Sequence, residues 1–104
     1  MSGFTRVAKL SEVPEGKAIV FEVGDARVAL CKANGSIYAI EDVCSHDGGP
    51  LGEGDLDGCD IICPRHGARF DIRTGAVLSF PAIVGVATYK VKIEGDAVLV
   101  EMPA

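Results

Sequence analysis

The stretch DVCSHDGGP, residues 42–50, places a cysteine two positions before a histidine. A second stretch, ICPRHGARF at residues 62–70, places a cysteine three positions before the only other histidine of the chain. Sixteen residues separate the first histidine from the second cysteine. Glycine follows each histidine closely, which is typical of loops whose backbone turns tightly. Both histidines of the chain therefore lie in short loops that also carry a cysteine.

Cys44, His46, Cys63 and His66 form a candidate set of four metal ligands. Thiolates and imidazoles bind zinc and also iron–sulfur clusters, so the residue types alone leave both metals open. A zinc finger usually places both cysteines in one loop and both histidines on one helix. Here each loop supplies one residue of each kind, which favours a two-iron cluster held between two loops. A structural zinc site, or no metal at all, is the alternative, and either would give a colourless protein.

The segments that flank the two loops carry the signals of β-strands. Residues 17–23 and 27–32 are rich in β-branched and alternating side chains and predict a hairpin. Asn34-Gly35 suits a type I′ turn into a third strand, because both of its central positions need positive φ. Residues 87–102 alternate polar and apolar side chains around a Gly-Asp turn and predict a second hairpin. The chain reads as all-β.

Composition bounds the class of protein. With 104 residues and 10.8 kDa, we expect a single domain over residues 1–104. The net charge of −5 argues against binding to nucleic acid or to an anionic membrane surface, because both need a basic face. No secretory signal and no membrane span is visible, so we expect a cytoplasmic protein whose thiols stay reduced.

The pattern CSHDGGPL…CPRHGARFD…TG closely resembles the Rieske iron–sulfur family, in which C-x-H is followed after about sixteen residues by C-x₂-H. The resemblance implies an antiparallel β-sandwich with a loop-rich cluster-binding subdomain at approximately residues 41–82, and one [2Fe-2S] cluster. It also implies that the two cysteines bind one iron and the two histidines bind the other, redox-active iron. The implied ligands are Cys44, His46, Cys63 and His66.

Departures from the family pattern indicate which branch of it the chain resembles. Respiratory and photosynthetic members clamp the two loops with a disulfide, but the corresponding positions here are Gly49 and Arg65. Those members also place a serine and a tyrosine near the second loop, where this chain has Ala68 and Phe70. Without these hydrogen-bond donors the reduced cluster is less stabilised. We expect a reduction potential near the low end of the Rieske range, about −150 mV.

The resemblance is therefore to soluble, low-potential Rieske ferredoxins of aromatic-ring dioxygenase systems. It implies a one-electron carrier, not an enzyme, that accepts electrons from an NADH-dependent flavin reductase and donates them to the terminal Rieske oxygenase. Oxygenase subunits add a mononuclear iron site with two histidine ligands, and this chain has no histidine to spare. A monomer is expected. The alternative is a small Rieske-fold subunit of an assimilatory nitrite reductase, which typically lacks the cluster ligands.

Other residues in and around this region have simpler interpretations. Cys31 and Cys59 are expected to be buried thiols, with a disulfide between them as the less favoured option. Pro81 either ends a strand or belongs to a loop that shields the cluster, as in the family. The acidic segment at residues 53–58 is expected to be a solvated loop, and docking of basic partners is the alternative.

Overall fold

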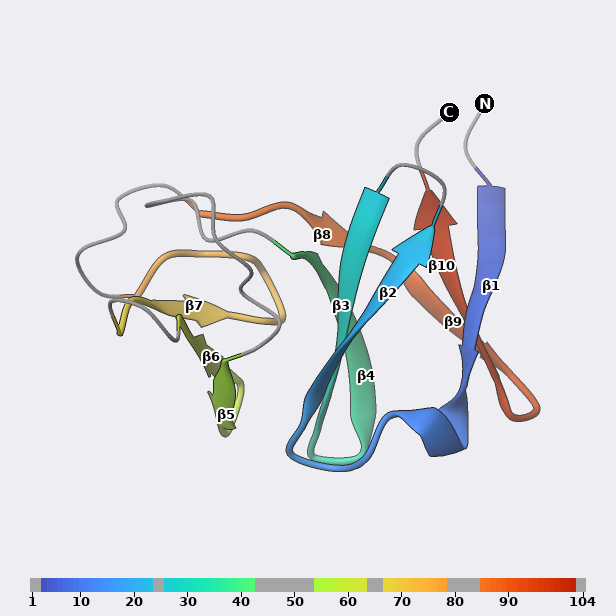
Figure 1. The fold of residues 1–104 in the computed structure, drawn as a ribbon, viewed down its shortest axis with the longest axis horizontal. Coiled ribbons are helices and arrows are strands. Elements are labelled where there is room, and N and C mark those ends of the chain that lie inside the picture. The colour runs from blue at the N-terminus through green and yellow to red at the C-terminus, as the bar shows by residue number, and fades with distance from the viewer. Residues whose placement is uncertain (1–2, 24–25, 43–53, 64–66, 79–84, 103–104) are drawn as a thin grey trace.

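The computed structural model describes residues 3–23, 26–42, 54–63, 67–78 and 85–102 (Figure 1). Within these ranges no helix is long and apolar enough to cross a membrane. The described residues form a short 3₁₀ helix, η1, and ten strands. Their bounds are β1 Gly3–Lys9, η1 Leu10–Glu12, β2 Ala18–Val23, β3 Ala26–Ala33, β4 Ser36–Glu41, β5 Asp55–Asp57, β6 Asp60–Ile62, β7 Arg69–Asp71, β8 Thr88–Tyr89, β9 Val91–Glu94 and β10 Ala97–Met102.

The described strands form three antiparallel sheets. A terminal sheet has the order β1-β10-β9, a central sheet the order β2-β3-β4-β8, and a small sheet the order β5-β6-β7. The terminal and central sheets lie on one side of the molecule and the small sheet on the other (Figure 1). The expected all-β, antiparallel fold class is confirmed, and so are both predicted hairpins.

Strand β3 contributes side chains to two separate cores. Val28 and Leu30 are fully buried in a core shared with the terminal sheet. Ala29 and Cys31 are fully buried in the second core, which lies against the small sheet. The second core also contains, from the small sheet and its flanks, Ile61, Cys63, Ala68, Phe70, Ile72 and Val86. Burial on both faces explains why this strand reads as a nearly continuous apolar run.

The turn between β3 and β4 has the backbone that the sequence predicts. Asn34 has φ of 54° and Gly35 has φ of 78°, as a type I′ turn requires. The Glu15 carboxylate accepts hydrogen bonds from the backbone N–H of Asn34 at 2.8 Å and of Gly35 at 2.9 Å. A side chain from the segment before β2 thereby fixes the turn.

Strands β1 and β5 differ from what the sequence analysis led us to expect. Strand β1 pairs with β10 with a register shift between Arg6 and Ala8, so it completes the terminal sheet. The described part of the acidic segment forms β5 instead of a solvated loop, and Asp57 pairs across the hairpin with Asp60. Two carboxylates opposite each other would repel. Arg69 on β7 offsets this, because its guanidinium lies 2.9 Å from the Asp57 carboxylate and 3.3 Å from that of Asp60.

Candidate metal centre

The second predicted ligand loop begins where strand β6 ends. Cys63 follows β6 directly, and its backbone N–H donates a 2.7 Å hydrogen bond to the carbonyl oxygen of Ala68, just before β7. The N–H of Gly67 donates in turn to the carbonyl oxygen of Cys63 at 2.9 Å. These two hydrogen bonds hold the ends of the loop together, so the position of Cys63 is fixed by the small sheet.

Cys63 is buried, with 2% of its surface exposed, and it packs in the core beside the small sheet. Ala68 and Phe70 belong to the same core and are fully buried, and neither carries a hydroxyl group. Among the described cysteines, all are free thiols. A soft sulfur donor at the base of a tight loop, with apolar neighbours behind it, fits ligation of iron in a cluster.

The first predicted ligand loop leaves strand β4 through Glu41 and Asp42. The backbone N–H of Glu41 donates a 3.0 Å hydrogen bond to the carbonyl oxygen of Ala87, and the backbone N–H of Ala87 donates a 3.1 Å hydrogen bond to the Glu41 carboxylate. Asp42 donates its N–H to the carbonyl oxygen of Arg27, and the Arg27 Nε donates to Asp42 Oδ2, each at 3.0 Å. The stem of this loop is therefore anchored on two sides, by contacts that the sequence analysis missed.

Most of the predicted site lies outside the described residues. Within the described ranges, no group of three or more histidine, cysteine, aspartate or glutamate side chains could hold a metal ion. Only Cys63 of the predicted ligands falls in those ranges, so the ligand set stays a prediction. The residues of the predicted site that fall outside them are Cys44, His46, Gly49, Arg65, His66 and Pro81.

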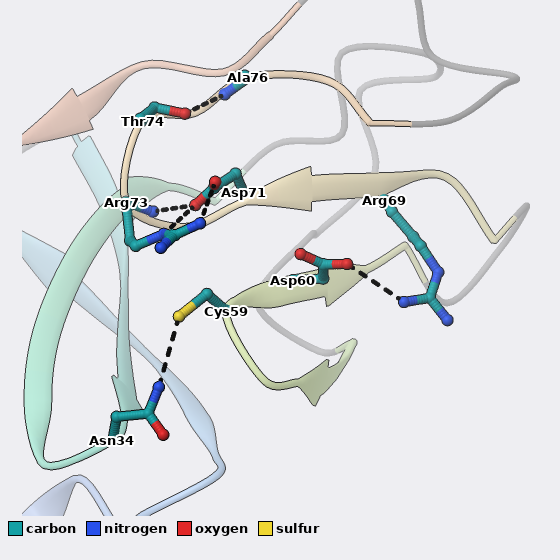
Figure 2. A network of polar contacts seen from close by, with 8 residues as sticks. All are labelled: Asn34, Cys59, Asp60, Arg69, Asp71, Arg73, Thr74 and Ala76. Atoms are coloured by element: carbon teal, nitrogen blue, oxygen red, sulfur yellow. Dashed lines mark hydrogen bonds and ion pairs between the residues drawn. The ribbon is translucent and has the colours of Figure 1, made fainter.

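A hydrogen-bonded turn follows strand β7. The Arg73 guanidinium donates to both oxygens of the Asp71 carboxylate, at 3.0 and 2.9 Å, and Asp71 also accepts the Arg73 backbone N–H at 2.8 Å (Figure 2). These hydrogen bonds lower the pKa of Asp71 and raise that of Arg73. The Gly75 N–H donates to the carbonyl oxygen of Asp71 at 2.7 Å. The turn brings Gly75 against Val86, whose N–H donates to the Gly75 carbonyl at 2.8 Å.

Cys31 and Cys59 take different places in the fold. Cys31 is fully buried, as expected, and burial raises the pKa of its thiol to about 12. Cys59 is only half-buried, in the turn between β5 and β6, and both are free thiols. The side-chain amide of Asn34, which extends from the central sheet, donates to the Cys59 sulfur at 3.8 Å (Figure 2). Cys59 therefore lies where the small and central sheets meet.

Comparison with known proteins identifies the family. A family model described as the Rieske [2Fe-2S] domain matches residues 3–90. The chain belongs to the Rieske [2Fe-2S] family. The predicted resemblance and fold are thereby confirmed, and a [2Fe-2S] cluster is the cofactor that this family binds.

Individual Rieske proteins are similar over nearly the whole chain. The ferredoxin component of a naphthalene 1,2-dioxygenase system from Pseudomonas aeruginosa is 39% identical over 93 residues, which is 89% of each protein. The structure of a ferredoxin from Sphingomonas yanoikuyae B1 has a TM-score of 0.91 and 30% identity, and it covers 97% of this chain and 100% of that one. A chain from a complex of oxygenase and ferredoxin of carbazole 1,9a-dioxygenase is 34% identical, with a TM-score of 0.86 and coverage of 93% and 91%.

A nitrite reductase subunit shares the fold only. The structure described as a putative small subunit of NADH-dependent nitrite reductase from Mycobacterium tuberculosis has a TM-score of 0.87 and covers 100% of this chain and 98% of that one. Its identity is 19%. The likeness therefore extends to the architecture, whereas the dioxygenase ferredoxins also share sequence.

Proposed function

We propose that this chain is a soluble, low-potential Rieske ferredoxin that carries single electrons to the oxygenase of an aromatic-ring dioxygenase system. The observation that carries the proposal is the 39% identity to a ferredoxin component of a naphthalene dioxygenase system, over 89% of both chains. In this role the chain is an electron carrier and performs no substrate chemistry itself. We further propose that it works as a single domain and a monomer in the cytoplasm.

One [2Fe-2S] cluster would be held by Cys44, His46, Cys63 and His66. The cluster would supply reversible uptake of one electron. The chain's own residues would fix its surroundings: the two hydrogen bonds at the base of the second loop hold Cys63, and the contacts of Glu41 and Asp42 hold the stem of the first loop. Neutral imidazole ligands on one iron would favour the added electron at that iron.

The proposed partners are a flavin-dependent ferredoxin reductase, which supplies electrons from NADH, and a terminal Rieske oxygenase. A ferredoxin in a solved complex with a carbazole dioxygenase oxygenase supports the second partner, because it is 34% identical to this chain. The carboxylate of Asp57 is paired with Arg69 at 2.9 Å, which supports a structural role for the acidic segment. We therefore expect electron-transfer rates to be nearly independent of added salt, and a steep fall would favour docking through these carboxylates.

The proposal is tested by spectroscopy of the purified protein. The visible spectrum and the electron paramagnetic resonance (EPR) spectrum of the reduced form should show a Rieske cluster, and a redox titration should give a midpoint of about −150 mV. A colourless, zinc-containing protein would overturn the proposed cofactor. A midpoint above zero would overturn the assignment to the low-potential branch.

Two variants separate ligands from other cysteines. Cys63→Ser should abolish the Rieske spectrum, whereas Cys59→Ser should retain it. Cys59 is half-buried in the turn before β6, at the opposite end of this strand from Cys63. Reduction of the wild-type protein by a dioxygenase flavin reductase and NADH, followed by reoxidation by the oxygenase, tests the partners. Failure with both enzymes, combined with binding to a nitrite reductase large subunit, would favour the alternative function.

A further inference from the structure

Asp42 is a buried charged residue at the entrance to the first ligand loop. It is the one polar or charged residue that is buried within the described ranges, and none of its side chain is exposed. It follows strand β4 directly and precedes Cys44 by two positions. A buried carboxylate is costly unless it is paired, because it loses its hydration. Its position beside a proposed cluster ligand therefore calls for a physical reason.

One partner of Asp42 is Arg27, the second residue of strand β3. The Arg27 Nε donates to Asp42 Oδ2 at 3.0 Å, and the Asp42 N–H donates to the Arg27 carbonyl oxygen at the same distance. Both the backbone and the side chain of Asp42 are thus tied to one residue of the central sheet. This double contact fixes Asp42, the last described residue before the first ligand loop.

Arg27 is half-exposed and has a second acidic neighbour. Its side chain is 53% exposed, and a second carboxylate, that of Glu22 on β2, lies 3.7 Å from its guanidinium. Arg27 also lines a hollow of about 450 Å³ together with Leu56 of strand β5 and Gly54, which directly precedes that strand. The cation therefore remains close to Asp42 while one side of it faces solvent.

We propose that Asp42 is a positioning residue for the first ligand loop and that the Arg27–Asp42 ion pair tunes the reduction potential of the cluster. The proposal rests on the proposed ligands Cys44 and His46. The negative charge of Asp42 opposes the added electron, and the positive charge of Arg27 offsets that effect. Because none of the Asp42 side chain is exposed, water screens its charge less than it screens the charge of an exposed residue.

The two members of the pair give opposite predictions for the potential at pH 8. Asp42→Asn removes a negative charge and should raise the midpoint, whereas Arg27→Gln removes a positive charge and should lower it. The double variant should return toward the wild-type value. If the residues served only to hold the loop, both single variants would shift the midpoint in the same direction and the double variant would not recover. That result would overturn the tuning.

A matched ion pair on the terminal sheet provides the control. Lys92 and Glu94 on strand β9 pair at 3.1 Å, and about half of each side chain is exposed. Glu94→Gln and Lys92→Gln make the same changes in net charge as the two test variants. We expect them to leave the midpoint unchanged. Shifts equal to those of the test variants would show an effect of net charge alone and would also overturn the proposal.

The positioning role has its own readout, the rate at which a chelator removes the cluster. Asp42→Ala should lose the cluster several times faster than the wild-type protein, and Arg27→Gln should lose it faster as well. Arg27→Lys keeps the charge but changes the geometry, so it should shift the midpoint little and lose the cluster at an intermediate rate. Equal rates in all variants would overturn the positioning role. A wild-type protein without a Rieske spectrum would instead refute the proposed function.

Discussion

Gly75 and Val86 lie in backbone contact, with the Val86 N–H donating a 2.8 Å hydrogen bond to the Gly75 carbonyl oxygen. A β-carbon on Gly75 would overlap the carbonyl oxygen of Val86, and one on Gly85 would lie 2.5 Å from the carbonyl oxygen of Gly75. Gly75 also has φ of +79°. The contact joins the turn after β7 to the segment that leads into β8. It thereby connects the small sheet with the central sheet.

Gly75→Ala should therefore destabilise the protein more than an alanine at another left-handed glycine. Gly35 has nearly the same φ, +78°, but nothing lies within 4 Å of the place that a β-carbon would take there. Gly35→Ala should lower the free energy of unfolding by about 1 kcal/mol through backbone strain alone. Gly75→Ala adds a clash with backbone atoms to this strain, so it should lower the free energy of unfolding by more than Gly35→Ala does. Denaturant unfolding measures both, and equal losses would mean that the contact with Val86 is easily relaxed.

The sequence carried enough local information to predict both hairpins. The turn at Asn34-Gly35 and the alternation in residues 87–102 depend on neighbours in the chain, and the structure has them as predicted. The Cys/His spacing was equally local, and it led to the correct family.

The elements that were missed depend on contacts between distant segments. Strand β1 has little alternation of its own and is defined by its pairing with β10 at the other end of the chain. The sequence of strand β5 resembles an acidic loop, because the Arg69 guanidinium that relieves its charge repulsion comes from β7. The burial of Asp42 likewise depends on Arg27, fifteen positions earlier. No local pattern in the sequence marks these pairings.

The two buried positions behind Cys63 should control the reduction potential. Ala68→Ser and Phe70→Tyr each restore a hydroxyl that high-potential Rieske proteins place near the second loop. A hydrogen bond to the cluster or to its cysteine stabilises the reduced state, so each variant should raise the midpoint. A differential stabilisation of about 1 kcal/mol corresponds to roughly 40 mV for one electron. Redox titration of the purified variants measures the shift.

The matched control for these variants is a substitution that adds a hydroxyl elsewhere in the same fold. Ala39 is buried in the other core, between the central and terminal sheets, so Ala39→Ser adds a buried hydroxyl away from Cys63. It should lower stability without changing the midpoint. If Ala39→Ser and Ala68→Ser shift the midpoint equally, the hydroxyl at position 68 does not act through the cluster.

The Glu15 carboxylate should stabilise the β3–β4 turn. It accepts the N–H groups of both Asn34 and Gly35, at 2.8 and 2.9 Å. Glu15→Ala should lower the free energy of unfolding by about 1 kcal/mol, because the two N–H groups then bond only to water. Glu15→Gln keeps one acceptor oxygen and should lose less. Hydrogen exchange at the amide of Gly35 should be faster in Glu15→Ala, and an unchanged exchange rate would show that the turn does not need the carboxylate.

Cys31 should make the protein less stable in alkaline solution. Burial raises the pKa of its thiol from 9.0 to about 12, so between these values the folded protein keeps a proton that the unfolded chain releases. The unfolded state then binds fewer protons, and the free energy of unfolding falls as pH rises above 9.0, by at most about 1.4 kcal/mol per pH unit. Cys31→Ala removes this dependence and costs stability at every pH through the cavity that it leaves. Denaturant unfolding of both proteins between pH 8 and 11 measures the difference between their free energies of unfolding. The contributions of titratable groups that both proteins contain cancel in this difference. A constant difference over this range would mean that the Cys31 thiol ionises in the folded protein as readily as in the unfolded chain.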